Sequence, residues 1–425
     1  MAARIVRQRG NRITIQVEVT LGDSMLQTEE GIQRATNEVG RVATHRALER
    51  FDTDGSPIEV AGVRMTSKGR QPKHYQTPYG EVTVARHVYQ TSQGGKTYCP
   101  LDQRARVVVA STPLFAKQVC WKYSQMSAGA VVRDLEENHG RHVTQAFVQD
   151  LAQAVSAVAE VKEQRWSYEV PKLEKPVRTI AIGMDGTCLL YYEGGKRQAM
   201  VGTISLYDRR GERLHTIYIG ASPEYGKERF LERMRREVER VKAQYPRAYR
   251  MGVADGASEN WKFLEPHTEA QLIDFWHAAE YLGRASWAVH ARDEEAREAW
   301  LEDRCHELKH KRGAAKRLCR ELEGVLAGKV PKRYRGALEE AVRYFGNHGS
   351  KMDYWKHTAE GRPIGSGVTE AACKVLVKQR LCGAGMRWKE QGARIVLTLR
   401  SLTTTEGRWG QFWRKVDQYG FTLAS

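Results

Sequence analysis

The sequence lacks the features of several protein classes. Its seven cysteines are scattered and odd in number, and no two form a Cys-x-x-Cys pair, so a disulfide framework or a cysteine-rich zinc site is not expected. No apolar run approaches the roughly 20 residues of a membrane-spanning helix. The basic start is not followed by the apolar segment of a secretory signal. Internal repeats and low-complexity tracts are also absent. A cytoplasmic protein without membrane association is therefore expected.

Positive charge is abundant. The 425 residues include 68 Lys and Arg against 51 Asp and Glu, a formal net charge of +17. A field of this sign favours polyanions through phosphate contacts, although it also fits a merely soluble basic protein. The length and the balance of 41% hydrophobic and 28% charged residues indicate a globular chain of more than one domain.

Residues 1–111 are predicted to form an α+β region. A strand-like start precedes a helix over 22–50, in which Leu26 and Ile32 belong to an apolar stripe. Alternating apolar and polar residues over 57–92, punctuated by Gly and Pro, predict a small antiparallel sheet.

Residues 112–160 change to a helical period. A helix, a break at 138–140 and a second helix capped by Thr144 have the length and punctuation of a helix-turn-helix motif. The second helix could enter a major groove of DNA, with Arg133 and Arg141 beside the turn. A plain helical hairpin fits the same pattern equally well.

The second half of the chain predicts an α/β core. After a polar, proline-containing linker at 161–176, residues 177–284 alternate strands and helices in the order of a mixed sheet. Residues 285–355 are helical and charge-rich. Residues 356–404 return to the core through a glycine-rich loop and two helices, and 405–425 form an aromatic tail.

Two apolar strands each end in an acid followed by glycine, at Asp185 and Asp255. Ligand sites in open α/β sheets lie at the carboxyl ends of strands, so two parallel neighbours would bring both carboxylates together. Two such carboxylates repel unless a cation lies between them, and hard oxygen ligands favour Mg²⁺ or Mn²⁺. The alternative is that each Asp-Gly pair is only a turn signal.

A metal pair for phosphoryl transfer needs a third carboxylate, for which Glu370 is the candidate. It follows the glycine-rich loop, near a helix start that Ser366 or Thr369 could cap. Glu370 could equally be a first-turn acid that only complements the helix dipole. Glu360, just before the loop, is the rival.

Asp274 and His277 lie three residues apart where a short strand passes into a helix, so they can face the same side. His277 could be a metal ligand, a proton shuttle or a group that orients a ligand, and it could also be a satisfied structural residue.

Cations and one aromatic residue surround Glu370 in the sequence. Such a mixture suits phosphate contacts and base stacking. It also fits a solvated basic face with the tryptophan in the core. The candidate DNA-binding residues are Arg362, Lys374, Lys378, Arg380, Arg387, Trp388 and Lys389.

The three acids, with Asp274 and His277 opening a long helical stretch before Glu370, resemble the DDE transposases of bacterial insertion sequences. The segments GMDGT, VADGASENW, IDFWHAAEYL and RPIGSGVTEAACK are similar to the ISKra family in particular. The resemblance covers roughly residues 95–425 and is strongest over 175–400.

The resemblance implies a ribonuclease H-like core, with the aspartates on its first and fourth strands and the glutamate on a late helix. An all-helical insertion would interrupt that core. It also implies Mg²⁺-dependent cleavage at transposon ends and transfer of the 3′-OH into target DNA, with Mn²⁺ as a substitute ion and at least a dimer on DNA. Alternatives are a nuclease or resolvase of the same fold that does not join DNA, and an inactive DNA-binding relative.

Overall fold

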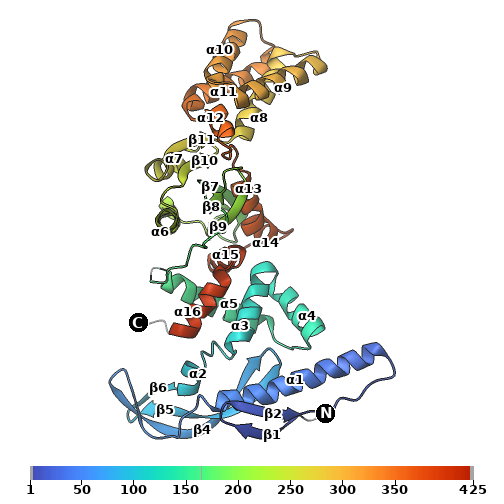
Figure 1. Cartoon of the computed structure of the whole chain (residues 1–425), viewed down its shortest axis with the longest axis vertical. Helices are drawn as coiled ribbons and strands as arrows, with labels where there is room; N and C mark the ends of the chain where they lie inside the picture. The colour runs from blue at the N-terminus through green and yellow to red at the C-terminus, as the bar shows by residue number, and fades with distance from the viewer. Residues whose placement is uncertain (1–2, 164, 422–425) are drawn as a thin grey trace. The chain divides into compact units, whose positions relative to one another are not determined.

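The chain divides into two compact units in the computed structural model, which describes residues 3–163 and 165–421 (Figure 1). One unit takes in Met1–Tyr168 and Arg408–Ser425, and the other takes in Glu169–Gly407. The boundary falls inside the predicted linker, and the expected tail belongs with the first unit. Among the described helices, none is both long enough and apolar enough to cross a membrane.

The first unit begins with a hairpin and a long helix. α1 starts after Ser24, whose side chain accepts a hydrogen bond from the backbone of Gln27, so the predicted helix is confirmed. Leu26 and Ile32 of the predicted stripe are, however, 67% and 45% exposed. The elements are β1 (Arg4–Arg9), β2 (Arg12–Gln16), α1 (Met25–Glu49) and an antiparallel sheet of β3 (Ile58–Val60), β4 (Val63–Thr77), β5 (Gly80–Thr91) and β6 (Gly94–Tyr98).

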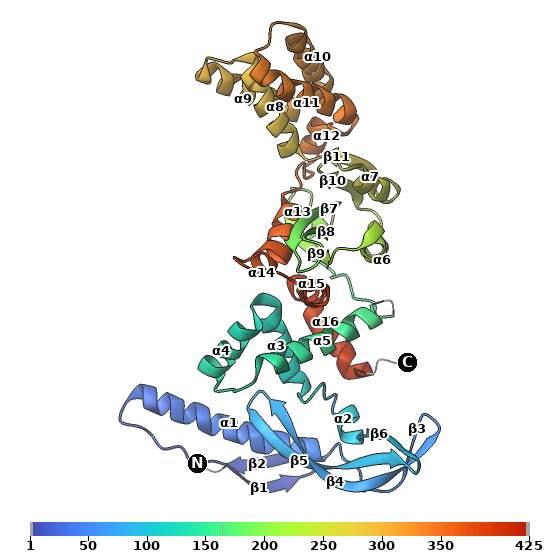
Figure 2. The ribbon, with the colours of Figure 1, turned by 180° about the vertical axis from the view of Figure 1, so that it is seen from behind.

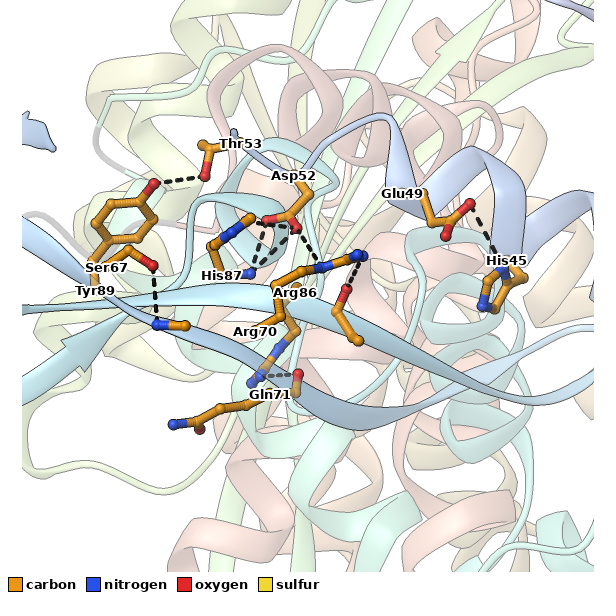
Figure 3. Close-up of polar contacts among 12 residues, drawn as sticks. His45, Glu49, Asp52, Thr53, Ser67, Arg70, Gln71, Arg86, His87 and Tyr89 are labelled. Atoms are coloured by element: carbon orange, nitrogen blue, oxygen red, sulfur yellow. Dashed lines mark hydrogen bonds and ion pairs between the residues drawn. The ribbon is translucent and has the colours of Figure 1, made fainter. Parts of the chain in front are cut away.

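A buried carboxylate ties the end of α1 to the sheet (Figure 3). The backbone N–H of His87 on β5 donates to both oxygens of Asp52, at 3.0 and 3.2 Å, and its Nδ1 lies 3.1 Å from Oδ2. Arg70 Nε on β4 lies 3.8 Å from the same carboxylate. Thr53 and Tyr89 add a hydroxyl–hydroxyl hydrogen bond of 2.7 Å. These polar contacts fix the helix in place on the sheet.

The helical part of this unit contains the predicted break. α4 ends at Gly140, which has φ of +59°, and Thr144 caps α5 by accepting from the backbone of Phe147. Seven of the 18 residues of α5 are buried, and its exposed positions carry no arginine. This favours the plain helical hairpin over a groove-reading helix. The helices are α2 (Pro100–Arg104), α3 (Pro113–Gln125), α4 (Ala128–His139), α5 (Gln145–Lys162) and α16 (Arg408–Tyr419).

The second unit is built on a mixed five-stranded sheet of order β11-β10-β7-β8-β9. β7, β8 and β9 are antiparallel, whereas β10 runs parallel to both β7 and β11. The mixed α/β core predicted from the sequence is therefore present. The strands are β7 (Thr179–Leu190), β8 (Lys196–Tyr207), β9 (Arg213–Ala221), β10 (Tyr249–Ala254) and β11 (Ala270–Ile273).

Helices cover this sheet and extend from its edge. Phe230, Met234, Val238 and Val241 form an apolar stripe on α6, and all four are buried. α8 leads from β11 to α9, α10 and α11, which gather in Figures 1 and 2 away from the sheet. Residues 328–331 separate α10 from α11. The helices are α6 (Glu228–Gln244), α7 (Ser258–Leu264), α8 (Phe275–Val289), α9 (Glu294–His310), α10 (Ala314–Ala327), α11 (Lys332–His348) and α12 (Tyr354–Ala359).

The return to the sheet is less regular than the sequence predicted. In place of one helix over 369–381, α13 (Gly367–Ala372) passes through a π-helical turn, η4 (Cys373–Lys378), into α14 (Gln379–Leu381). The buried side chain of Arg400 on α15 (Glu390–Thr404) donates to the carbonyl of Val375 inside that turn. Burial lowers the pKa of Arg400 to about 10, which still leaves it charged at neutral pH. α15 packs on β9, where Ser401 Oγ accepts from the backbone of Gly220 at 2.9 Å.

Candidate active site

Asp185 and Asp255 both follow the stretch in which β7 and β10 pair in parallel. The last pair is Gly183 with Val253, and each aspartate lies two residues beyond it, Asp185 still within β7 and Asp255 just after the last residue of β10. Neighbouring strands are about 4.8 Å apart. Both aspartates are partly exposed, although each follows a buried strand segment. The predicted parallel pairing of the two strands is present, and Asp255 follows the end of β10, whereas Asp185 lies inside β7, which continues to Leu190 instead of ending at the acid as predicted.

The Asp185 carboxylate has two close donors. The backbone N–H of Gly186 donates to Oδ1 at 2.6 Å, and the thiol of Cys373 lies 3.3 Å from Oδ2. Burial, with the charge of Asp185, raises the pKa of Cys373 above its usual value. The thiol therefore stays protonated at neutral pH and acts as a hydrogen-bond donor to the carboxylate.

Asp255 stands where β10 meets the helical region. The backbone N–H of Ala257 donates to its Oδ1 at 3.2 Å, and the hydroxyl of Tyr344 on α11 donates to its carbonyl at 3.3 Å. Burial, followed by the charges of Tyr281, Asp255 and Asp274, raises the pKa of Tyr344. Tyr344 is therefore a neutral donor that links the helical region to the strand end carrying Asp255.

The helix carrying Glu370 approaches β7 at a glycine. A Cβ on Gly183 would lie 2.0 Å from Thr369 Oγ1, so a larger residue there would push α13 away. Thr369 and Thr203 of β8 share a buried hydrogen bond of 2.7 Å that fixes the helix on the sheet. As a result, Asp185 and Glu370 line one cavity of about 740 Å³, together with Lys374 and Lys378.

Glu370 is also connected to Asp274. Ser366 Oγ donates to Glu370 Oε1 at 2.9 Å, and the backbone N–H of Ser366 donates to Asp274 Oδ2. The other oxygen of Asp274 accepts from the backbone of His277 at 2.9 Å and lies 3.6 Å from its Nδ1. One group of potential ligand atoms in the described chain falls within 4.8 Å, that of Asp274, His277 and Glu370. Asp185 and Asp255 are outside that group.

The charges of this cluster reinforce each other. Burial alone would raise the pKa of Asp274, but hydrogen bonds from His277 and Ser366 outweigh it and hold the pKa at about 2. The carboxylate of Asp274 raises the pKa of His277 to about 9, with further contributions from Glu280 and Glu370. Without a bound ion, His277 is therefore mainly a cation at neutral pH, paired with the carboxylate of Asp274. A metal bound by Asp274, His277 and Glu370 would have to displace that proton.

The rival carboxylate lies elsewhere. Glu360 forms an ion pair with Arg362, whose guanidinium lies 3.4 Å from the ring centroid of Tyr249. Tyr249 is the first residue of β10, whereas Asp255 follows its last residue. Glu360 and Arg362 therefore lie at the opposite end of the strand from the aspartates, which removes Arg362 from the immediate surroundings of the site.

The candidate DNA-binding residues divide by exposure. Two arginines are buried: Arg141 donates to the carbonyl of Thr77 at 3.0 Å, and Arg380 lies 5.4 Å from the ring centroid of Trp388. Both predictions of DNA contact are corrected, because these guanidinium groups stabilise the interior. Trp388 is half-buried, with its indole N–H on the carbonyl of Leu381. The exposed candidates are Arg133, Lys374, Lys378, Arg387 and Lys389.

Three residues with a part in this arrangement escaped the sequence-based prediction. Cys373 lies one helical turn after Glu370, a spacing that could have indicated it. Gly183, two residues before Asp185, could have indicated a close helix–strand approach. Tyr344 is distant in sequence, and no local pattern points to it.

A scan of the chain against protein-family models finds no match, and no curated protein matches it. The function must therefore be argued from the site itself.

Proposed function

We propose that this protein is a DDE transposase with a ribonuclease H-like catalytic core, which cleaves DNA at transposon ends and transfers the 3′-OH into target DNA. The observation that carries the proposal is that Asp185 and Asp255 each lie two residues beyond the last pair of the neighbouring parallel strands β7 and β10. These are the first and fourth strands of the sheet in chain order, as the sequence resemblance implies. The helical region α9–α11 between β11 and Glu370 corresponds to the implied insertion.

The donor set suits Mg²⁺, with Mn²⁺ as an expected substitute. Asp185, Asp255 and Glu370 offer carboxylate oxygens, which are the hard ligands that Mg²⁺ prefers. Asp185, Asp255 and Glu370 would together hold the ions. The bound ions would supply activation of the attacking oxygen and stabilisation of the leaving oxygen.

The chain's own residues would hold and orient the reactants. Lys374 and Lys378 line the cavity beside Asp185 and are placed to contact a phosphate in it. Asp274 and Ser366 fix the orientation of Glu370 through their hydrogen bonds. Pairing of two transposon ends requires at least a dimer on DNA.

An assay with candidate element ends, target plasmid and Mg²⁺ tests the proposal. The wild-type chain should cleave and join. D185N, D255N and E370Q should each lower both activities by about a thousandfold or more, because each removes a metal-binding charge at the reacting phosphate. Duplex binding in EDTA, measured in parallel, should be unchanged.

The matched control is E360Q, which removes a carboxylate outside the site and should retain activity. Cleavage without joining would support a nuclease or resolvase instead. Binding without either reaction would support an inactive relative. Full joining by D185N and D255N would contradict the mechanism.

A further inference from the structure

The N-terminal hairpin presents a face made of arginine and polar side chains. β1 and β2 are antiparallel, with Arg4 opposite Gln16, Arg7 opposite Thr14 and Arg9 opposite Arg12. Directly opposed residues share one face of a two-stranded ribbon, so these six lie on the same side. All six are exposed, and residues 3–17 contain no Asp or Glu to neutralise them. We call this the outer face of the ribbon.

The inner face of the ribbon packs against α1. Ile13 and Ile15 on this face are half-buried, in alternation with the exposed residues of β2. Arg46 of α1 donates to Gln8 Oε1 at 2.9 Å, and Arg50 donates to Asn11 Oδ1 at 2.6 Å. α1 in turn is fixed to the sheet by the Asp52 cluster (Figure 3). The ribbon is therefore a supported element, and its outer face is free for a partner.

The shape and chemistry of this face match one partner class. The major groove of B-DNA is about 12 Å wide and admits a two-stranded β-ribbon. Arginines contact phosphates or the acceptors of guanine, and Gln16 and Thr14 can bond base edges. We propose that the outer face of the β1–β2 ribbon binds the major groove of duplex DNA. The proposal rests on the proposed function only in taking DNA as the substrate.

This site replaces the one first expected in α4 and α5. The exposed positions of α5 carry Gln145, Gln149 and Asp150, and Arg141 is buried. The ribbon instead carries four exposed arginines on a single face. The ribbon belongs to the same unit as α4 and α5, whereas Asp185 belongs to the other unit.

Binding of the full-length chain to a fluorescent duplex of about 30 base pairs, in EDTA and at several salt concentrations, tests the proposal. R7Q/R9Q/R12Q should weaken binding at least about tenfold and lower the slope of log K against log salt by up to about 2.7, about 0.9 per lost phosphate contact. Arg4 is left intact because it bonds Gln16 within the ribbon.

The matched control is R64Q/K68Q/K96Q, which removes the same charge from exposed positions of β4 and β6 in the same unit. It should change affinity less than about twofold. Equal weakening by the two variants would reduce the effect to overall charge and overturn the proposal, as would no weakening by the ribbon variant. Circular dichroism of both variants checks that the fold is retained.

Three further arms identify the partner and the groove. Methyl green, a major-groove ligand, should compete with the wild-type chain, whereas competition by netropsin alone, or by neither ligand, would contradict the assignment. A ribbon variant that lost binding to single-stranded DNA or to phosphatidylserine vesicles but kept duplex affinity would also overturn it. Because these arms need no metal, their failure is distinct from failure of cleavage. Cleavage of transposon ends by a chain whose ribbon does not bind DNA would refute this inference and leave the proposed function intact.

Discussion

Asp274 is a fully buried carboxylate, and a buried charge is tolerated only where hydrogen bonds compensate its lost hydration. Two backbone N–H groups do so, from His277 at the start of α8 and from Ser366 before α13. The side chain therefore joins two segments that are 92 residues apart in sequence. Through Ser366, which also donates to Glu370, Asp274 is connected to the carboxylate of the candidate site.

Replacing Asp274 by Ala should destabilise the second unit by about 2–4 kcal/mol, since an N-cap is lost and two buried N–H groups lose their acceptor. Thermal unfolding of the full chain, followed by far-UV circular dichroism, measures the change. The Mg²⁺ concentration for half-maximal cleavage should also rise several-fold, because Glu370 loses its support.

S366A separates positioning from stability. It removes only the hydroxyl that donates to Glu370 and keeps the backbone N–H on Asp274. We expect nearly unchanged unfolding but a raised Mg²⁺ requirement. An unchanged Mg²⁺ requirement in both variants would show that Asp274 is purely structural.

At the scale of elements, the site depends on how closely α13 approaches β7. Gly183 leaves room for Thr369, and any Cβ there would overlap the hydroxyl at 2.0 Å. G183A should therefore displace α13 with Glu370, cost about 1–3 kcal/mol through overpacking and lower cleavage about a hundredfold. Cleavage rates and thermal unfolding measure the two effects.

T369A removes the overlapping hydroxyl, so G183A/T369A should recover part of the activity lost in G183A. The control is G324A in the last turn of α10, where an added Cβ meets nothing within 4 Å. It should stabilise the helix by about 0.5–1 kcal/mol and leave cleavage unchanged. Full activity of G183A would show that the position of α13 is not critical.

Sequence patterns predicted those elements whose signals are local. The apolar runs ending at Asp185 and Asp255 identified β7 and β10, and Thr144 marked the start of α5. Strand order depends on the tertiary structure and not on a local pattern. Only the observed parallel pairing of β7 and β10 shows that the segments carrying the two aspartates are neighbours. Whether Arg141 faced solvent or the interior likewise depended on contacts with Thr77, 64 residues away.

The π-helical turn after Glu370 shows a second limit. Nothing in the residues 373–378 distinguishes it from an α-helix, because its widened hydrogen-bond pattern is supported from outside by Arg400. His277 was ambiguous from sequence for a similar reason. Its contact with Asp274 and its place in one group with Glu370 depend on the tertiary structure.

On the scale of the whole molecule, the first unit combines residues 1–168 with the distant segment 408–425. Phe412 of α16 is fully buried, with its ring centroid 5.8 Å from that of Trp166. Arg106 donates to the carbonyls of Asp417 and Gln418 at the end of the same helix. The unit that carries the arginine ribbon is therefore complete only when the C-terminal helix is docked on it.

F412A should consequently destabilise this unit by about 3–5 kcal/mol through cavity formation. Hydrogen exchange would report the change as faster exchange in α5 and α16, with exchange in β7 and β10 unaffected, because those strands belong to the other unit. R414A, an exposed neighbour on α16, is the control and should change neither region.

If exchange in β7 rose together with that in α5, the two units would unfold as one. In that case a destabilised N-terminal unit would impair cleavage as well as DNA binding. If the units unfold separately, F412A should weaken duplex binding while the carboxylate site keeps its fold.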